Sequence, residues 1–368
     1  MNDQDLLYPI ALTLVKGIGN ITAKQIIEAV DDVSLLFKEK NRLPEHIPGI
    51  SKKLIAEIHH PDVLRKAEQE VLFIEKNKIT PLFIKDKQYP ARFRDCVDAP
   101  IVLYLKGNAD LNAPKIISIV GTRHASAYGK EVTETLIQDI AAAYPETLII
   151  SGLAYGIDIY AHKAALKYNL PTIGVLAHGL DRIYPPAHRN TAVEMLEHGG
   201  LLTDFLSGTN PDRPNFVKRN RIIAGISDCT VVVESAGKGG ALITASIADS
   251  YNKDVFSIPG KINDPYSMGC NALIKYKKAV LITCAEDIFR EMCWNLTQVK
   301  PAVQRSIFVE LTADEQLVVD CVSKTATMQL NTIAMESNLP ISQLAPVLFE
   351  LEMKGIVRCM PGGLYGLI

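Results

Sequence analysis

Between residues 115 and 290, short apolar segments alternate with longer segments in which apolar residues recur every three or four positions. The apolar segments are KIISIV, TLIIS, TIGVL, GLLTDF, CTVVVE, DVFSI and AVLIT. Apolar strands separated by amphipathic helices are typical of a parallel sheet with helices on both faces. We therefore predict an α/β fold over residues 76–293, an extended Rossmann-like doubly wound sheet, with two leading connector strands in PLFIKD and IVLYLKG.

Residues 1–75 follow a helical pattern and contain two similar segments, VKGIGNITAKQIIEAV and IPGISKKLIAEI. Each places a glycine-bearing turn after an apolar residue and before an amphipathic helix. This is a helix-hairpin-helix (SAM-like) pattern, whose turn amides can bind a phosphate. A small helical module that only packs its own core is an equally good interpretation.

The segment 294–310 has no clear periodicity and is predicted to be a linker. Beyond it, Thr312 and Glu315 have the spacing of a capping box, two further helical segments follow, and IVRCMPGGLYGLI indicates a hairpin. Three helices and a hairpin predict a winged-helix domain over residues 311–368. Its acidic residues outnumber its basic ones, so we expect it to contact protein or support a dimer rather than enter a DNA groove.

Composition restricts the remaining possibilities. The formal net charge is −2, so a polyanionic partner has to be held by a local patch. Seven scattered cysteines, with no CxxC pair, indicate reduced thiols in a cytoplasm rather than disulfides or zinc. No apolar run is long enough for a membrane span or a secretory signal. We expect no membrane association, no metal and no cofactor.

Glycines and cations gather in the loops that follow the predicted strands. In doubly wound sheets, ligands bind beyond the carboxyl ends of the strands. The small or glycine residues in these loops are Gly121, Thr122, Ser151, Gly152, Gly156, Gly239 and Gly240. The cations are Arg123, Arg182, Arg189, Arg213, Lys218, Arg219, Arg221 and Lys238. The first turn fits neither GxGxxG nor the P-loop pattern, which leaves a small anion-binding turn.

The segment NFVKRNRIIAGISD places Lys218, Arg219 and Arg221 in the first turns of a helix that is expected to start near Pro214. The dipole of that helix repels cations at its N-terminus, so an anionic partner is expected there. Gly225 would let the far end of the helix pack closely on the sheet.

Aromatic side chains accompany these cations. Phe205 and Phe216 flank the cluster and Tyr184 lies on the preceding loop. Cations with interleaved rings suit a single nucleic-acid strand, since phosphates meet the charges and bases stack on the rings. The alternative is that the cations are neutralised within the protein by four nearby carboxylates, Asp181, Asp204, Asp212 and Glu234.

Two enzymatic interpretations also remain open at this point. Asp158 and His162 are four residues apart on one helix, which suits an acid/base pair or a hydrogen bond that holds a loop. The segment GKGGALITA resembles the glycine turn of Rossmann-like nucleoside-monophosphate phosphoribohydrolases, but it lacks the glutamate of their motif.

Taken together, these residues resemble the DNA-processing protein A (DprA, or Smf) family. The matching stretches are SIVGTR, IISGLAYGIDIYAH, TIGVLAHGLDRIYP, GGLLTDF, FVKRNRIIAGISD, VVVESAGKGGALITA and VFSIPG. The resemblance implies a non-enzymatic protein that binds and protects incoming single-stranded DNA and loads the RecA recombinase onto it during natural transformation. It also implies a homodimer formed through the Rossmann-like domain, and single-strand-binding protein is a further candidate partner.

The resemblance also implies roles for individual residues. The family's phosphate-binding turn falls on Gly121, Thr122 and Arg123, and its Phe-x-x-Arg-Asn-Arg motif starts at Phe216. The full set of expected DNA-binding residues is Gly121, Thr122, Arg123, Ser151, Gly152, Gly156, Arg189, Arg213, Phe216, Lys218, Arg219, Asn220, Arg221, Lys238, Gly239 and Gly240.

Overall fold

The computed structural model describes residues 3–30, 32–39, 43, 47, 50–294, 311–325, 327–360 and 363–367. They belong to two compact units, Met1–Leu296 and Thr297–Ile368, and each is described here by itself. From residue 295 on, the predicted linker lies outside the described residues.

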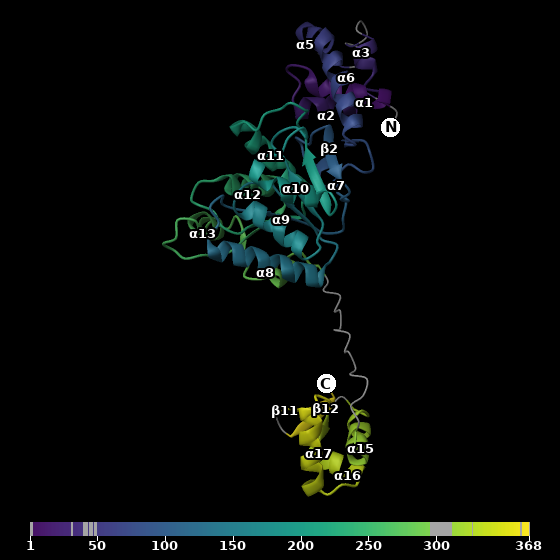
Figure 1. The fold of residues 1–368 in the computed structure, drawn as a ribbon, viewed down its shortest axis with the longest axis vertical. Coiled ribbons are helices and arrows are strands. Elements are labelled where there is room, and N and C mark those ends of the chain that lie inside the picture. The colour runs from purple at the N-terminus through teal and green to yellow at the C-terminus, as the bar shows by residue number, and fades with distance from the viewer. Residues whose placement is uncertain are drawn as a thin grey trace. The chain divides into compact units, whose positions relative to one another are not determined.

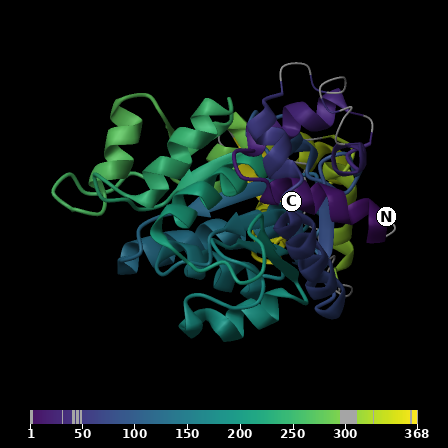
Figure 2. The same cartoon turned by 90° about the horizontal axis from the view of Figure 1, so that it is seen from above.

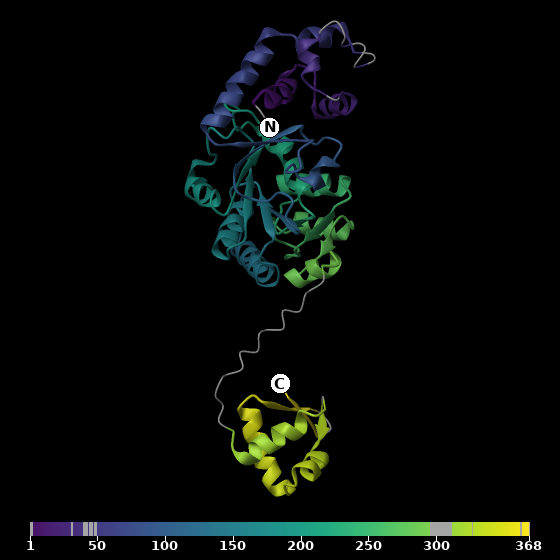
Figure 3. The same ribbon diagram turned by 90° about the vertical axis from the view of Figure 1, so that its right-hand side faces the viewer.

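The first unit begins with a module of helices, purple and blue in Figure 1. They are α1 (Asp3–Leu14), α2 (Asn20–Ala29), α3 (Leu35–Lys38), α5 (Lys52–Ile58) and α6 (Pro61–Lys76). The module is fastened to the sheet domain that follows it (Figures 2 and 3). The Lys24 ammonium donates to the carbonyls of Arg94 (2.8 Å) and Cys96 (3.1 Å). The buried carboxylate of Glu70 accepts from the Ser207 amide and hydroxyl.

The predicted doubly wound sheet is confirmed. Within the described part of the chain, nine strands form one sheet in the order β1-β2-β6-β5-β4-β3-β7-β8-β9. The strands are β1 (Thr80–Phe83), β2 (Val102–Gly107), β3 (Ile116–Val120), β4 (Leu148–Ser151), β5 (Thr172–Val175), β6 (Gly199–Thr203), β7 (Cys229–Val232), β8 (Asp254–Ser257) and β9 (Val280–Leu281). Strands β3 to β9 run parallel, while β1 and β2 are antiparallel to their neighbours.

Helices cover both faces of this sheet. They are α7 (Ala91–Arg94), α8 (Ala127–Ala143), α9 (Ile157–Lys167), η2 (Pro186–His188), α10 (Arg189–Met195), α11 (Arg213–Ile226), α12 (Gly240–Ser250), α13 (Met268–Lys275) and α14 (Ala285–Glu291). Alternate residues of β3 face opposite sides. Ile117 and Ile119 pack in the cluster of α8, α9 and α14, whereas Ile116 and Val120 belong to the cluster that contains α11 and α12.

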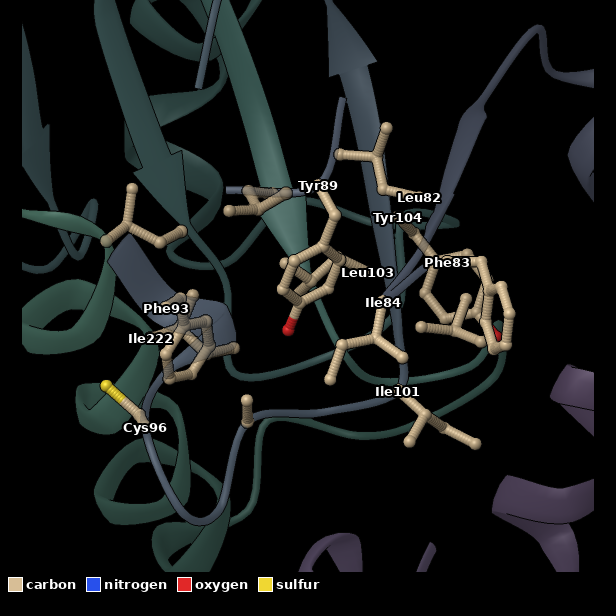
Figure 4. Packing of buried hydrophobic residues seen from close by; sticks show 14 of the residues in the cluster. Leu82, Phe83, Ile84, Tyr89, Phe93, Cys96, Ile101, Leu103, Tyr104 and Ile222 are labelled. Carbon is tan, nitrogen blue, oxygen red and sulfur yellow. The ribbon is translucent and has the colours of Figure 1, made fainter. Parts of the chain in front are cut away.

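At Gly225 the end of α11 packs closely on Phe93 of α7 (Figure 4), while α11 also contacts β3 and β5 of the sheet. A side chain at Gly225 would overlap the ring of Phe93, so glycine is required for this close approach. The neighbouring Tyr89 is fully buried, and its hydroxyl donates to the Pro100 carbonyl at 2.6 Å.

The order of the strands creates a crevice. The chain adds β4, β5 and β6 on one side of β3, and α11 then leads it back to place β7 on the other side. The loops after β3 and β7 therefore diverge at their carboxyl ends, which is where open α/β sheets bind ligands.

The second unit is the predicted winged-helix domain. It contains α15 (Ala313–Val322), β10 (Met328–Gln329), α16 (Leu330–Ser337), α17 (Ile341–Met353), β11 (Val357–Met360) and β12 (Leu364–Leu367). The three strands pair in the order β10-β12-β11, and Val318, Leu344 and Leu348 help to form a separate hydrophobic core. The Thr312–Glu315 capping box is present as predicted.

Candidate nucleic-acid interface

A cavity of about 670 Å³ opens at the crevice between β3 and β7. The loop after β3, the first half of α11 and the loop before α12 line it. It brings together ten of the sixteen residues predicted to bind DNA: Gly121, Thr122, Arg123, Arg213, Phe216, Arg219, Asn220, Lys238, Gly239 and Gly240.

The loop after β3 is held by backbone hydrogen bonds. The Thr122 amide donates to the Glu234 carbonyl at 2.7 Å, and the Thr122 carbonyl accepts from the Ile157 amide at 3.1 Å. Gly156 has φ +79° and packs so closely that a side chain there would overlap the Thr122 carbonyl. The loop thus has a fixed shape from which the exposed Arg123 projects.

Three cations form what we call the rim of the cavity: Arg123, Arg213 and Lys238. All three are exposed, and within the described ranges none makes an ion pair with a carboxylate. The Arg123 guanidinium lies 5.4 Å from the centre of the Phe216 ring, and the Tyr184 ring packs edge-on against that ring at 6.0 Å. The rim therefore offers free positive charge beside an aromatic surface.

Arg219 and Asn220 form the floor of the cavity. Arg219 is only 3% exposed, and its guanidinium donates to the carbonyls of Gly152 (2.7 Å) and Val175. Burial lowers the pKa of Arg219 to about 10, against the attraction of Asp158, so the side chain stays charged at neutral pH. Burial likewise raises the pKa of Asp158, although Arg219 opposes that shift. The floor therefore carries the charge of Arg219, whose guanidinium is already hydrogen-bonded within the protein.

Arg221 and Lys218 point away from this cavity. The buried Arg221 guanidinium pairs with Asp204 at 2.5 Å and also donates to the Asp98 carbonyl. One of the four carboxylates in the alternative interpretation thus neutralises one cation of the cluster. Lys218 is exposed but lies outside the cavity.

The dipole argument made from the sequence is wrong for this cluster. Helix α11 starts at Arg213, so Lys218, Arg219 and Arg221 lie in its second and third turns. The repulsion by a helix dipole is confined to the first turn.

The other carboxylates of that alternative interpretation do not pair with the rim. Asp181 pairs with Arg182 at 2.8 Å. The carboxylate of Glu234 accepts from the Ser126 amide (2.9 Å) and hydroxyl (2.5 Å).

Four further predicted residues lie outside the cavity, and three of them support it. The Ser151 hydroxyl is buried and donates to the Ile119 carbonyl at 2.6 Å. Gly152 lies against the Arg219 guanidinium, and Gly156 lies against the loop after β3. Arg189 begins α10 and does not line the cavity.

Asp158 and His162 have separate partners. Asp158 accepts from the Gly152 amide at 3.2 Å, whereas His162 Nδ1 lies 2.7 Å from the Thr172 hydroxyl. Burial lowers the pKa of His162 to about 3. Both side chains therefore hold the loop and the helix in place, as the hydrogen-bond interpretation expected, but each bonds elsewhere in the fold.

Sequence reasoning did not single out His124 and Tyr266, which also line the cavity with ring centres 6.0 Å apart. His124 follows the predicted turn directly, so its position was a usable signal. Tyr266 comes from the loop after β8, where no local pattern marks it.

The described residues show neither a metal-binding cluster nor a membrane-spanning helix. They contain no group of three or more His, Cys, Asp or Glu side chains arranged to hold a metal ion. None of the described helices combines the length and the apolar character needed to cross a membrane.

Comparison with known proteins agrees with the resemblance seen in the sequence. The family model for DNA recombination-mediator protein A matches residues 80–293, and that for the DprA winged helix domain matches residues 309–363. The chain is 41% identical to the DNA processing protein DprA of Bacillus subtilis over 215 residues, which are 58% of this chain and 71% of the relative.

Two solved structures are similar to this chain. The DNA processing protein A of Streptococcus pneumoniae is 32% identical, with a TM-score of 0.58 over 74% of this chain and 98% of the other. The protein from Helicobacter pylori, described for its single-stranded DNA binding mode, is 28% identical, with a TM-score of 0.53 over 59% and 96%. With its central domain matched by the family model, its strand order and its winged helix, the chain belongs to the DNA recombination-mediator protein A (DprA) family.

Proposed function

We propose that this protein binds single-stranded DNA at the cavity between β3 and β7. The observation that carries the proposal is the rim: three exposed cations without ion pairs in the described chain, which line one cavity together with Phe216. Separated cations suit consecutive phosphates, and the ring gives a base a stacking surface. The similar protein from Helicobacter pylori, which binds single-stranded DNA, supports the same conclusion.

In this proposal fourteen of the sixteen predicted residues divide by task. Arg123, Arg213 and Lys238 bind phosphates, helped by the amides of Gly239 and Gly240 at the start of α12. Phe216 stacks on a base. Arg219, Asn220, Ser151, Gly152 and Gly156 keep the floor and the loops in place, and Arg221 ties α11 to the body. Arg189 and Lys218 lie beyond the cavity as contacts for a longer strand.

The wider role that we propose is protection of incoming DNA and loading of RecA onto it during natural transformation, in the cytoplasm and as a homodimer. The family model, a recombination mediator, supports the RecA step. All seven cysteines are unpaired, which suits a reducing compartment. Single-strand-binding protein is a further proposed partner.

The winged-helix domain is proposed to contact protein. Its third helix, α17, has Ile341, Phe349 and Met353 exposed at four- or eight-residue intervals and carries no Lys or Arg. The domain contains six acidic residues and three basic ones: Asp314, Glu315, Asp320, Glu336, Glu350 and Glu352 against Lys324, Lys354 and Arg358. Such a surface repels the phosphates of a DNA groove.

The proposal is tested by titrating labelled oligo-dT and a duplex of equal length with the full chain. We expect tighter binding of the single strand, and weaker binding after Arg123→Ala but not after Arg65→Ala, an exposed arginine on α6. Equal affinity for both DNA forms, or an unaffected Arg123 variant, contradicts the assignment. The RecA step is tested by filament growth on DNA coated with single-strand-binding protein, which should accelerate when this protein is added.

The alternative enzyme, a nucleoside-monophosphate phosphoribohydrolase, predicts release of a free base from a nucleoside monophosphate. Among the described residues, Asp158 is the only carboxylate that lines the cavity, and it is buried against the Gly152 amide. We therefore expect no base release in the same preparation that binds oligo-dT.

A further inference from the structure

A second cavity, of about 870 Å³, adjoins the DNA site, and we call it the groove. One wall is the α1–α2 turn and the start of α2, represented by Gly19 and Ile21. The other wall includes Val217 and Lys218 of α11 and Phe205 after β6. Val217 lines both cavities, so the groove is continuous with the site.

Two adjacent faces of helix α11 line the two cavities. Arg213, Phe216 and Asn220 face the site, whereas Lys218 and Arg221 face the groove. Successive helix residues are 100° apart, so these are adjacent faces of one cylinder. A strand that crosses Val217 passes directly from one cavity into the other.

The charge of the groove permits a phosphate backbone. Lys218 is exposed and has no ion-pair partner in the described chain. Of the two carboxylates of the groove, Asp204 is neutralised by Arg221, whereas Asp98 accepts a hydrogen bond from the Tyr251 hydroxyl at 2.5 Å, which supplies no compensating charge. The groove is thus less positive than the site, and its contacts to bases and sugars should matter more than its contacts to phosphates.

Exposed apolar side chains along the edge of the groove provide those contacts. Ile21 and Val217 are each 47% exposed, and Val97 is 64% exposed. Phe205 adds a half-buried ring. In a protein without a partner, such apolar side chains around a polar groove indicate a surface that is covered on binding.

The α1–α2 turn adds donors to this groove. Gly17 has φ +93°, which lets the chain reverse within the turn. Helix α2 is ten residues long, and its N-cap Gly19 provides no side-chain acceptor. The amides of its first turn therefore have no partner within the helix. Because Lys24 and Glu70 fasten the module to the sheet domain, this wall of the groove is preformed.

We propose that single-stranded DNA bound at the site continues across Val217 into the groove and contacts the α1–α2 turn. The N-terminal helical module is then part of the DNA-binding surface, which is the DNA-contacting alternative of its helix-hairpin-helix pattern. The inference rests on the proposed function, because the strand has to occupy the site before it reaches the groove.

The test compares oligo-dT of about 6 and about 20 nucleotides, since only the longer strand should span both cavities. We expect Ile21→Glu to weaken binding of the longer strand about tenfold, because it replaces an apolar contact with a carboxylate that repels phosphates. Binding of the shorter strand should stay at the level of the parent. Lys218→Ala should also weaken binding of the longer strand. If the Ile21 variant melts at a lower temperature than the parent, the Lys218 variant provides the test instead.

Leu72→Glu is the matched control, because Leu72 is an exposed apolar residue on α6 that does not line the groove. Equal binding of the long strand by the parent and both groove variants overturns the proposal. Arg123→Ala distinguishes failure of this inference from failure of the proposed function. It weakens binding of both the short and the long strand if DNA binds at the site, and of neither if the site is wrong.

Discussion

The rim and the floor of the DNA site use the same kind of residue for opposite purposes. Arg123 and Arg213 are exposed and, in the described chain, make no ion pair. Arg219 is 3% exposed and is engaged with two backbone carbonyls. The rim has charge available for a ligand, whereas Arg219 of the floor uses two hydrogen bonds to join α11 to Val175 of β5 and to Gly152, directly after β4.

This difference indicates that a cation in a binding motif can also serve the fold. Arg219 adds a positive field to the cavity while it fixes the position of Phe216 and Asn220 on the same helix. Asn220 in turn donates to the Gly240 carbonyl at 3.3 Å, which links α11 to the start of α12. Substitutions in the floor should therefore change stability and binding together, and substitutions in the rim should change binding alone.

The largest effect is expected from Arg219→Ala. Removal of this buried charge leaves Asp158 without its compensating cation and two carbonyls without a donor. We expect the free energy of unfolding to fall by about 3–5 kcal/mol. Chemical denaturation measures this loss, and the variant should also bind oligo-dT poorly. A variant as stable as the parent would show that the floor has no structural role.

The buried residues packed around the floor should also make the fold sensitive to acid. His162 has a folded pKa of about 3 because it is buried, so it stabilises the fold above its unfolded pKa near 6.5. That stability is lost as the pH falls from about 6.5 toward 3. Between pH 7 and pH 5 the parent should lose about 2 kcal/mol more than His162→Gln. Identical pH profiles of unfolding for the two proteins would show that His162 is not the source of the acid sensitivity.

DNA binding should also depend on the Phe216 ring beside the rim. Phe216→Ala should weaken oligo-dT binding by about 1–3 kcal/mol without lowering the melting temperature, because Phe216 is only partly buried. Phe216→Leu keeps an apolar side chain without the ring, and Phe216→Trp keeps an aromatic surface. Stacking is supported if only the Trp variant binds like the parent, and it is refuted if all three variants do.

Much of the fold was predictable from the sequence, because buried parallel strands give unmistakable apolar runs. KIISIV and CTVVVE became β3 and β7, side by side in the sheet. Since the loops after parallel strands meet at one edge, Gly121 to Arg123 and Lys238 to Gly240 were correctly expected to lie near each other.

The division of the cations was not predictable from spacing. Arg219 and Arg221 are two residues apart, yet their partners come from distant parts of the chain: Gly152 for the former and Asp204 for the latter. The phase of α11 could have separated Arg213 from Arg221, but only the tertiary structure shows which side chain is buried. The groove was equally hidden, because its walls are about 200 residues apart in sequence.

The central claim is that the rim binds phosphates, and the salt dependence of binding tests it most directly. For single strands, each phosphate contact contributes about 0.7 to the slope of log affinity against log salt. The double variant Arg123→Ala/Arg213→Ala should therefore show a slope shallower than that of the parent by about 1.4, while Arg65→Ala should match the parent. Equal slopes for the parent and the double variant would contradict the account.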